Sequence, residues 1–99
     1  MPGKIVVGFE DKPGPGEVRE IFQHASWARS RTERSIALML RASLCVVTAR
    51  KDRRLVGIGR AWGDGCFRAV IDDFVVVPPE RGKNVGTRIV KMLLTRLAT

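Results

Sequence analysis

The sequence has little of what metal sites and membrane proteins need: two cysteines, one histidine and no long apolar run among 99 residues. Cys45 and Cys66 are far apart and form no metal-ligand pattern with a single histidine, so we expect no metal site and two reduced, buried or partly buried thiols. No segment is apolar enough to span a membrane. The N-terminus lacks the long apolar region of a signal peptide, so we expect a cytoplasmic protein.

Acidic side chains are also few, with ten Asp and Glu against eighteen Lys and Arg, which gives a net charge of +8. The excess is concentrated in residues 29–60, which hold nine basic side chains against Glu33 and Asp52. Such a block attracts nucleic acid, acidic proteins or anionic cofactors. No aromatic residues are interleaved with these arginines to stack bases. We therefore do not favour nucleic acid as the partner, although a small basic nucleic-acid-binding protein remains an alternative.

Hydrophobic periodicity predicts one domain in which a strand is followed by two helices, three strands and a last helix. The short apolar run "KIVVGFE" ends at "DKPGPG", whose Pro and Gly residues interrupt any regular element. Helical spacing then predicts a helix from Glu17 to about Ala28. Ser30, three residues before Glu33, fits a capping box and predicts a second helix that ends near Ser43.

The second half of the chain changes to a period of two. The runs "LCVVTAR", "RLVGIGRAW" and "FRAVIDDFVVVP" predict three strands, and their short connections predict an antiparallel meander. Val75, Val76 and Val77 break the alternation, which indicates burial on both faces or a bulge. Apolar residues at helical spacing from about Asn84 predict the last helix. The expected fold class is a mixed α/β (α+β) sandwich.

The segment "RGKNVGT" lies between the last predicted strand and the last predicted helix. A helix N-terminus offers unpaired N–H groups and the positive end of the helix dipole, which suit phosphate oxygens. Gly82 and Gly86 allow a ligand to come close, Arg81 and Lys83 add charge, and Thr87 adds a hydroxyl donor. The segment is neither a P-loop nor a dinucleotide fingerprint. Alone, it fits an anion site or an ordinary strand-to-helix turn.

The longer stretch "IDDFVVVPPERGKNVGTRIVKMLL" resembles the acetyl-CoA-binding core of the GNAT N-acetyltransferase superfamily. That core is a strand ending in hydrophobic-x-hydrophobic-Pro, then Arg/Gln-x-x-Gly-x-Gly/Ala and a helix. The matching residues are Val75-Val76-Val77-Pro78, followed by Arg81-Gly82-Lys83-Asn84-Val85-Gly86. The order of elements and the two preceding strands also resemble the N-terminal half of the family, from about Lys4 onward. The resemblance implies a GNAT-like fold with a mostly antiparallel mixed sheet.

The resemblance also implies acetyl-CoA as cosubstrate and direct transfer of its acetyl group to a primary amine of a small molecule or peptide. Backbone groups of Val75 and Val77 would pair with the pantetheine arm. The N–H groups from Gly82 to Thr87 would hold the pyrophosphate. The implied cofactor-binding residues are Val75, Val76, Val77, Arg81, Gly82, Lys83, Asn84, Val85, Gly86 and Thr87.

Two adjacent carboxylates, Asp72 and Asp73, are the candidate catalytic residues, since either could accept the proton of the amine directly or through water. Because adjacent strand residues point to opposite faces, we expect at most one of them to face the site. The alternative is a salt-bridged or strand-end carboxylate. Phe22 and Trp27 are weaker candidates for an acceptor pocket, and His24 is expected on a helix surface.

Three departures from the family pattern bear on activity. Asn84 replaces the usual Gly, and we expect it to take the left-handed backbone conformation that Asn tolerates. The sequence has no Tyr, which in the family often protonates the leaving thiolate. The sequence also ends after the last helix, so we expect a truncated fold of doubtful activity and a homodimer formed through the exposed strand near Val75. A non-catalytic CoA-binding or interaction module remains an alternative.

Overall fold

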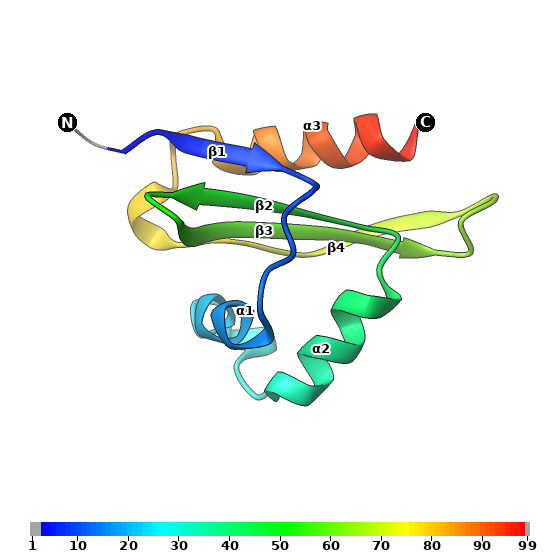
Figure 1. Ribbon diagram of the computed structural model, residues 1–99, viewed down its shortest axis with the longest axis horizontal. Coiled ribbons are helices and arrows are strands. Elements are labelled where there is room, and N and C mark those ends of the chain that lie inside the picture. The colour runs from blue at the N-terminus through cyan, green and yellow to red at the C-terminus, as the bar shows by residue number, and fades with distance from the viewer. Residues whose placement is uncertain (1–2, 99) are drawn as a thin grey trace.

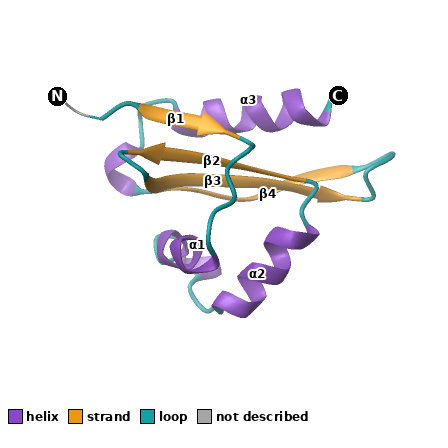
Figure 2. Ribbon diagram, in the orientation of Figure 1, coloured by secondary structure: helices purple, strands orange, loops and turns teal. Residues whose placement is uncertain are grey.

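The computed structural model describes residues 3–98 as a four-stranded sheet with helices on both faces (Figures 1 and 2). The elements, in chain order, are β1 (Ile5–Gly8), α1 (Pro15–Phe22), α2 (Glu33–Ala42), β2 (Cys45–Lys51), β3 (Arg54–Gly63), β4 (Ala69–Val76) and α3 (Val85–Leu97). This order confirms the predicted one. Within the described range, no helix has both the length and the apolar character needed to cross a membrane.

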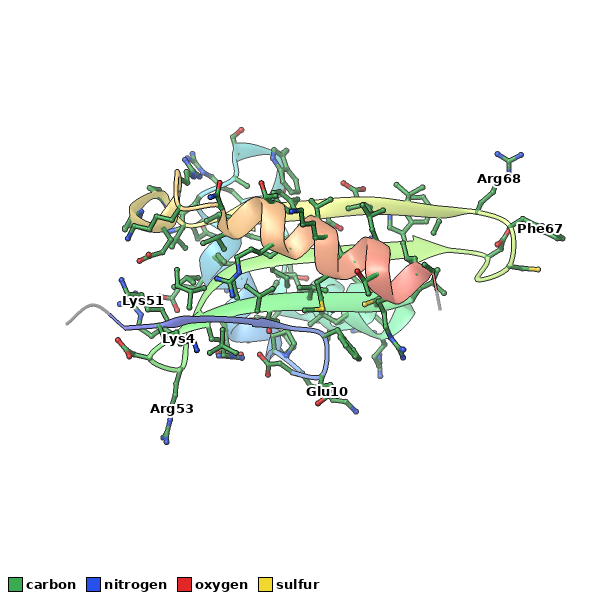
Figure 3. All side chains as sticks on the ribbon, turned by 90° about the horizontal axis from the view of Figure 1, so that it is seen from above. Lys4, Glu10, Lys51, Arg53, Phe67 and Arg68 are labelled. Atoms are coloured by element: carbon green, nitrogen blue, oxygen red, sulfur yellow. The ribbon has the colours of Figure 1, made fainter. Side chains whose placement is uncertain are left out.

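The sheet has the order β1-β2-β3-β4, and each neighbouring pair is antiparallel. The meander of β2, β3 and β4 confirms the prediction from their short connections. The described strands therefore show the antiparallel part of the sheet that the resemblance implied. Figure 1 shows α3 on one face and α1 and α2 on the other. The β3–β4 hairpin extends beyond the helices, and Phe67 at its tip is 90% exposed (Figure 3).

Each face of the sheet has its own hydrophobic core. Fully buried side chains on the α1/α2 face include Val18, Phe22 and Ile36, and those on the α3 face include Val47, Val85, Ile89 and Leu93. Burial of one such side chain contributes about 1.5–3 kcal/mol. Val75 packs in the first core and Val76 against the second, so the predicted burial of the valine run on both faces is confirmed.

The helix α1 ends at Phe22 rather than near Ala28, and it begins two residues earlier than predicted. Beyond Phe22, the backbone bonds tighten to a spacing of three residues: the His24 N–H donates to the Ile21 carbonyl at 3.1 Å and the Ala25 N–H to the Phe22 carbonyl at 3.0 Å. Arg29 Nε also donates to the Gln23 carbonyl at 3.0 Å. Such local bonds compete with continuation of a helix. The chain therefore continues as a loop that contains a short 3-10 turn at Ser26–Ala28.

The helix α2 begins at Glu33, but its cap is Thr32 and not the predicted Ser30. The Ser35 N–H donates to Thr32 Oγ1 at 3.1 Å, and the Thr32 N–H donates to Ser35 Oγ at 3.0 Å. This reciprocal pair is a capping box in which a Ser takes the part usually played by Glu or Gln. A helix that starts here buries Ile36 completely against the sheet.

The strand β4 contains a bulge, in which Asp73 and Phe74 together face the single residue Gly59 of β3. Asp73 has a φ of +52°, which is uncommon for a residue other than glycine. A bulge was one of the two explanations that the sequence offered for the broken alternation. It lies just before the valine run rather than within it.

Candidate functional site

A cleft of about 610 Å³ lies between β4, the start of α3 and the loop that follows α1. Of the ten predicted cofactor-binding residues, all line this cleft except Val77 and Lys83. Neither Asp72 nor Asp73 lines it. The structure therefore brings the strand end and the basic turn together into one concave surface and places the two candidate bases beside it.

One wall of the cleft is the outer edge of β4. The Val77 N–H donates to the Val56 carbonyl of β3 at 2.9 Å, so it points into the sheet. Because backbone groups alternate in direction along an antiparallel strand, Val75 also faces β3, and the N–H and C=O of Val76 face outward. The Arg81 Nε already donates to that Val76 carbonyl at 2.8 Å. The backbone group that faces a ligand is therefore that of Val76, not those of Val75 and Val77.

The opposite end of the cleft is the N-terminus of α3. The first helical hydrogen bond runs from the Arg88 N–H to the Asn84 carbonyl at 3.0 Å, so the N–H groups of Val85, Gly86 and Thr87 have no helical acceptor. Asn84 has a φ of 62°, which confirms the predicted left-handed conformation, and Gly82 has a φ of +79°. These donors and the helix dipole together suit an anion.

A buried carboxylate, Glu80, lies under this turn, and sequence reasoning missed it. Lys83 Nζ lies 3.0 Å from Glu80 Oε1, and Lys51 Nζ lies 3.3 Å from Glu80 Oε2. The hydrogen bond from Lys83, assisted by the one from Lys51, holds the pKa of Glu80 below its ordinary value against the opposing effect of burial. The charge of Lys83 is thus engaged with Glu80. The spacing of three residues between Glu80 and Lys83 was the available sequence signal.

The two glycines of the turn have different roles. At Gly86, an added Cβ would lie 3.0 Å from the Phe74 ring, so the missing side chain makes room for that ring rather than for a ligand. At Gly82, an added Cβ would meet no atom within 4 Å, so the backbone there is open. Its positive φ nevertheless favours glycine. Phe74 is 36% exposed and forms part of the cleft wall.

The two adjacent carboxylates lie on the same face of the sheet, contrary to expectation. Asp72 pairs with Arg60 across the strands, and Arg60 Nε also lies 2.5 Å from Asp73 Oδ2. The bulge removes the usual alternation at this point. The Asp73 side chain is only 2% exposed, and its other oxygen lies 2.7 Å from Arg31 Nη1. Asp72 is exposed and accepts the Asp73 N–H at 2.8 Å.

The loop after α1 forms the remaining wall. Trp27 is 54% exposed and lines the cleft, as does His24, which lies in this loop rather than on the predicted helix. Phe22 is fully buried and packs against Trp27 with ring centroids 6.1 Å apart. Of the two acceptor-pocket candidates, Trp27 therefore reaches the cleft and Phe22 supports it from below.

The nine basic side chains of residues 29–60 do not form one surface. Within residues 3–98, four of them form ion pairs with carboxylates of the fold: Arg31, Arg50, Lys51 and Arg60. Arg53 lies at the end of the molecule opposite the β3–β4 tip (Figure 3). Charges that are already paired inside the protein contribute little to phosphate binding, so this arrangement weakens the nucleic-acid alternative.

The cysteines are both free, and they differ in environment. Cys45 is buried, and burial raises the pKa of its thiol. Cys66 is exposed near the tip of the β3–β4 hairpin, so the expectation that both thiols are at least partly buried is wrong for this residue. Over residues 3–98, no group of three or more His, Cys, Asp and Glu side chains is placed to hold a metal ion.

Residues 12–99 match the sequence profile of the Acetyltransferase (GNAT) family. A probable acetyltransferase from meticillin-resistant Staphylococcus aureus has a similar structure, with a TM-score of 0.86 and 24% identity over 96% of this chain and 70% of that chain. An aminoglycoside 6′-N-acetyltransferase complexed with coenzyme A has a TM-score of 0.79 and 20% identity over 94% of this chain and 55% of that chain.

A GNAT family acetyltransferase from Brucella melitensis in complex with acetyl-CoA is also similar, with a TM-score of 0.74 and 14% identity over 97% of this chain and 70% of that chain. No curated protein matches this chain in sequence. At these identities the structural similarities show a shared fold, while the family profile spans most of the sequence. The chain belongs to the acetyltransferase (GNAT) family.

Proposed function

We propose that this chain binds acetyl-CoA in the cleft and transfers its acetyl group to a primary amine of a small molecule or peptide. One observation carries the proposal: the cleft joins an outward-facing strand edge at Val76 to the unbonded N–H groups at the start of α3. A strand edge suits the amide-bearing pantetheine arm, and a helix N-terminus suits a pyrophosphate. Two of the similar structures contain coenzyme A or acetyl-CoA, which supports this assignment.

In this arrangement the N–H groups of Val85, Gly86 and Thr87 hold the pyrophosphate, and the exposed Arg81 adds positive charge nearby. The pantetheine arm follows β4 and meets the Val76 N–H. This direction carries the thioester toward the bulge at Asp73 and Phe74. The acceptor then approaches from the loop that carries Trp27.

Of the two candidate bases, we propose Asp72 as the proton acceptor, acting directly or through water. Its side chain is exposed next to the bulge. Both carboxylate oxygens of Asp73 are engaged by guanidinium groups, and the side chain is 2% exposed, so it is poorly placed to meet an amine.

The proposal is tested by calorimetry with acetyl-CoA on the Gly82→Ala variant. Gly82 has a φ of +79°, and a left-handed Ala costs about 1–2 kcal/mol, so we expect binding to weaken by roughly 5- to 30-fold if the turn must keep this shape. Gly65→Ala is the matched control, because Gly65 has a φ of +75° in the β3–β4 connection, away from the cleft. The control should lose similar stability and keep its affinity.

Failure of the unmodified chain to bind acetyl-CoA would refute the proposal. Binding without thiol release over a panel of amines would instead favour a non-catalytic CoA-binding module. Steep salt-dependent binding to random RNA, with no acetyl-CoA binding, would favour the nucleic-acid alternative.

We also propose that a second copy of the chain pairs with the outer edge of β4, the strand around Val75, in competition with the pantetheine arm, which is proposed to meet the same edge at Val76. Within residues 3–98, β4 is an edge strand, and its residue Val70 is 43% exposed. Exposed strand edges recruit other chains, and lysine on an edge opposes this. Light scattering should show a dimer that Val70→Lys disrupts and Val6→Lys, on the other edge of the sheet, leaves intact. A monomer at high concentration would refute this proposal.

A further inference from the structure

Arg31 connects the loop that forms one wall of the cleft to the β4 bulge beside the cleft. Its Nη1 is 2.7 Å from Asp73 Oδ1, on the bulge of β4. Its guanidinium carbon is 5.4 Å from the Trp27 ring centroid and 5.3 Å from the Phe22 ring centroid. Both distances are in the range of a cation–π contact. One side chain therefore connects the loop after α1 to a strand residue 42 positions later.

The strand side of this connection is held independently. Asp73 Oδ2 lies 2.5 Å from Arg60 Nε, and Arg60 Nη1 donates to Ser43 Oγ at 3.2 Å, at the end of α2. A carboxylate that is 2% exposed needs such partners, because an unpaired buried charge is costly. The bulge is thus fixed by Arg60, while Arg31, at 33% exposure, joins the fixed bulge to the cleft loop.

The loop that carries Trp27 depends on Arg31 more strongly than the bulge does. Trp27 is 54% exposed, so packing alone holds it weakly. The planar guanidinium lies over its ring and over that of Phe22 at cation–π distance. Trp27 lines the proposed acceptor side of the cleft, and Phe74 of the bulge lines the other side. Arg31 therefore links the loop that carries Trp27 to the strand that carries Phe74.

We propose that Arg31 is a positioning residue of the acetyl-transfer site: it fixes the cleft loop at Trp27 against the β4 bulge through Asp73, and so orients the acceptor amine toward the thioester. Asp73 takes part as the anchor of this connection and not as the base. This inference rests on the proposed function for its catalytic consequence, whereas the positioning of Trp27 is testable without any ligand.

The ligand-free test uses Trp62→Phe as the background, so that Trp27 is the single tryptophan. Acrylamide quenching of its fluorescence is compared between Arg31→Gln and Arg34→Gln. Arg34 is an exposed arginine of α2 and serves as the matched control for loss of one positive charge. Since Trp27 is already 54% exposed, full release would raise the quenching constant by a factor of about 1.9 at most. We expect Arg31→Gln to approach that ceiling and Arg34→Gln to leave the constant unchanged.

Far-UV circular dichroism and thermal unfolding establish that the variants remain folded. Should Arg31→Gln fail to fold, Arg31→Lys decides the question, because it keeps the charge beside Asp73 but lacks the planar group that stacks on Trp27. We expect this variant to fold with a raised quenching constant. An unchanged constant in the folded Arg31 variants would overturn the inference, as would an equal rise in the Arg34→Gln control.

The catalytic consequence is measured with an amine from the panel that supports thiol release. Misplacement of reacting groups by about 1 Å costs roughly 100-fold in rate, so we expect kcat/KM for the amine to fall by between about 10- and 100-fold in Arg31→Gln. The acetyl-CoA Kd, which depends on the turn at α3, should stay within about threefold. Equal losses in both quantities would overturn a positioning role. Absence of acetyl-CoA binding in the unmodified protein would refute the proposed function while leaving the quenching result to decide the role of Arg31.

Discussion

The contact between Gly86 and Phe74 offers a sharp test of how the cleft is built. Gly86 lies in the first turn of α3, and the Phe74 ring of the β4 bulge packs directly over it. Gly86→Ala introduces a single methyl group at this contact. The ring must then shift or turn outward into the cleft.

The size of the effect follows from the geometry. The new Cβ would lie 3.0 Å from Phe74 Cζ and 3.2 Å from Cε1, whereas carbon atoms pack at about 3.5–4.0 Å. Overpacking costs about 1–3 kcal/mol, and the 36% exposure of the ring allows partial relief, so about 1.5 kcal/mol is reasonable. Replacing Gly by Ala near a helix N-terminus returns roughly 0.5 kcal/mol. We expect a net loss of about 1 kcal/mol and a Tm lowered by about 4–8 °C.

The same substitution should change sign when Phe74 is made smaller. In the Phe74→Leu background the added methyl has room, so Gly86→Ala should stabilise by roughly 0.5 kcal/mol. Urea and thermal unfolding of the unmodified protein, the two single variants and the double variant give the coupling free energy between Gly86 and Phe74. Gly8→Ala, whose Cβ meets no atom within 4 Å, is the control and should change stability by less than about 0.5 kcal/mol. Equal effects of Gly86→Ala in both backgrounds would refute the packing role.

The remaining predictions concern one cap, one ion pair and the proposed base. Thr32→Ala should lower the free energy of unfolding by about 1 kcal/mol in urea melts, whereas Ser30→Ala should have little effect, because Thr32 caps α2. Hydrogen bonds from Arg50 lower the pKa of Glu17 below its ordinary value of 4.5. The ion pair therefore contributes to the free energy of unfolding above pH 4.5, and this contribution is lost as the pH falls through the lowered pKa. Glu17→Gln should therefore lower the free energy of unfolding by about 1 kcal/mol at neutral pH, a figure discounted because the side chain is partly exposed, and by nothing in acid. A stability difference between variant and unmodified protein that stays constant from neutral pH into acid would contradict this. Asp72→Asn should reduce acetyl transfer by about 100-fold with acetyl-CoA affinity unchanged, and full activity would exclude Asp72 as the base.

The elements of the fold were predictable because their signals are local. The period of two before Val77 and the helical spacing after Asn84 each arise from neighbouring residues that share one face. The left-handed conformation of Asn84 was likewise predictable from the residue type. Errors occurred where local signals compete. Thr32 and Ser30 are both plausible caps, and after Phe22 the backbone bonds tighten to a spacing of three residues, which periodicity does not register.

The site was predictable only in part. The sequence located the turn before α3 as a candidate anion site, and the structure places most of the predicted residues around one cleft. The sequence did not reveal that Glu80 lies buried beneath the turn or that the outward-facing backbone groups belong to Val76. Both depend on where β2 and β3 lie relative to β4, and no local pattern encodes that placement.

The sequence alone determined the order of the elements, the family and the turn before α3, because these depend on residue types at fixed spacing along the chain. Only the tertiary structure decided the fates of the two adjacent aspartates. The bulge places Asp73 on the same face of the sheet as Asp72. Arg31 and Arg60, which are 42 and 13 residues away from Asp73, form ion pairs with Asp73 and not with Asp72. Partners that only folding brings within hydrogen-bonding distance decide which of the two carboxylates is buried and paired and which stays exposed.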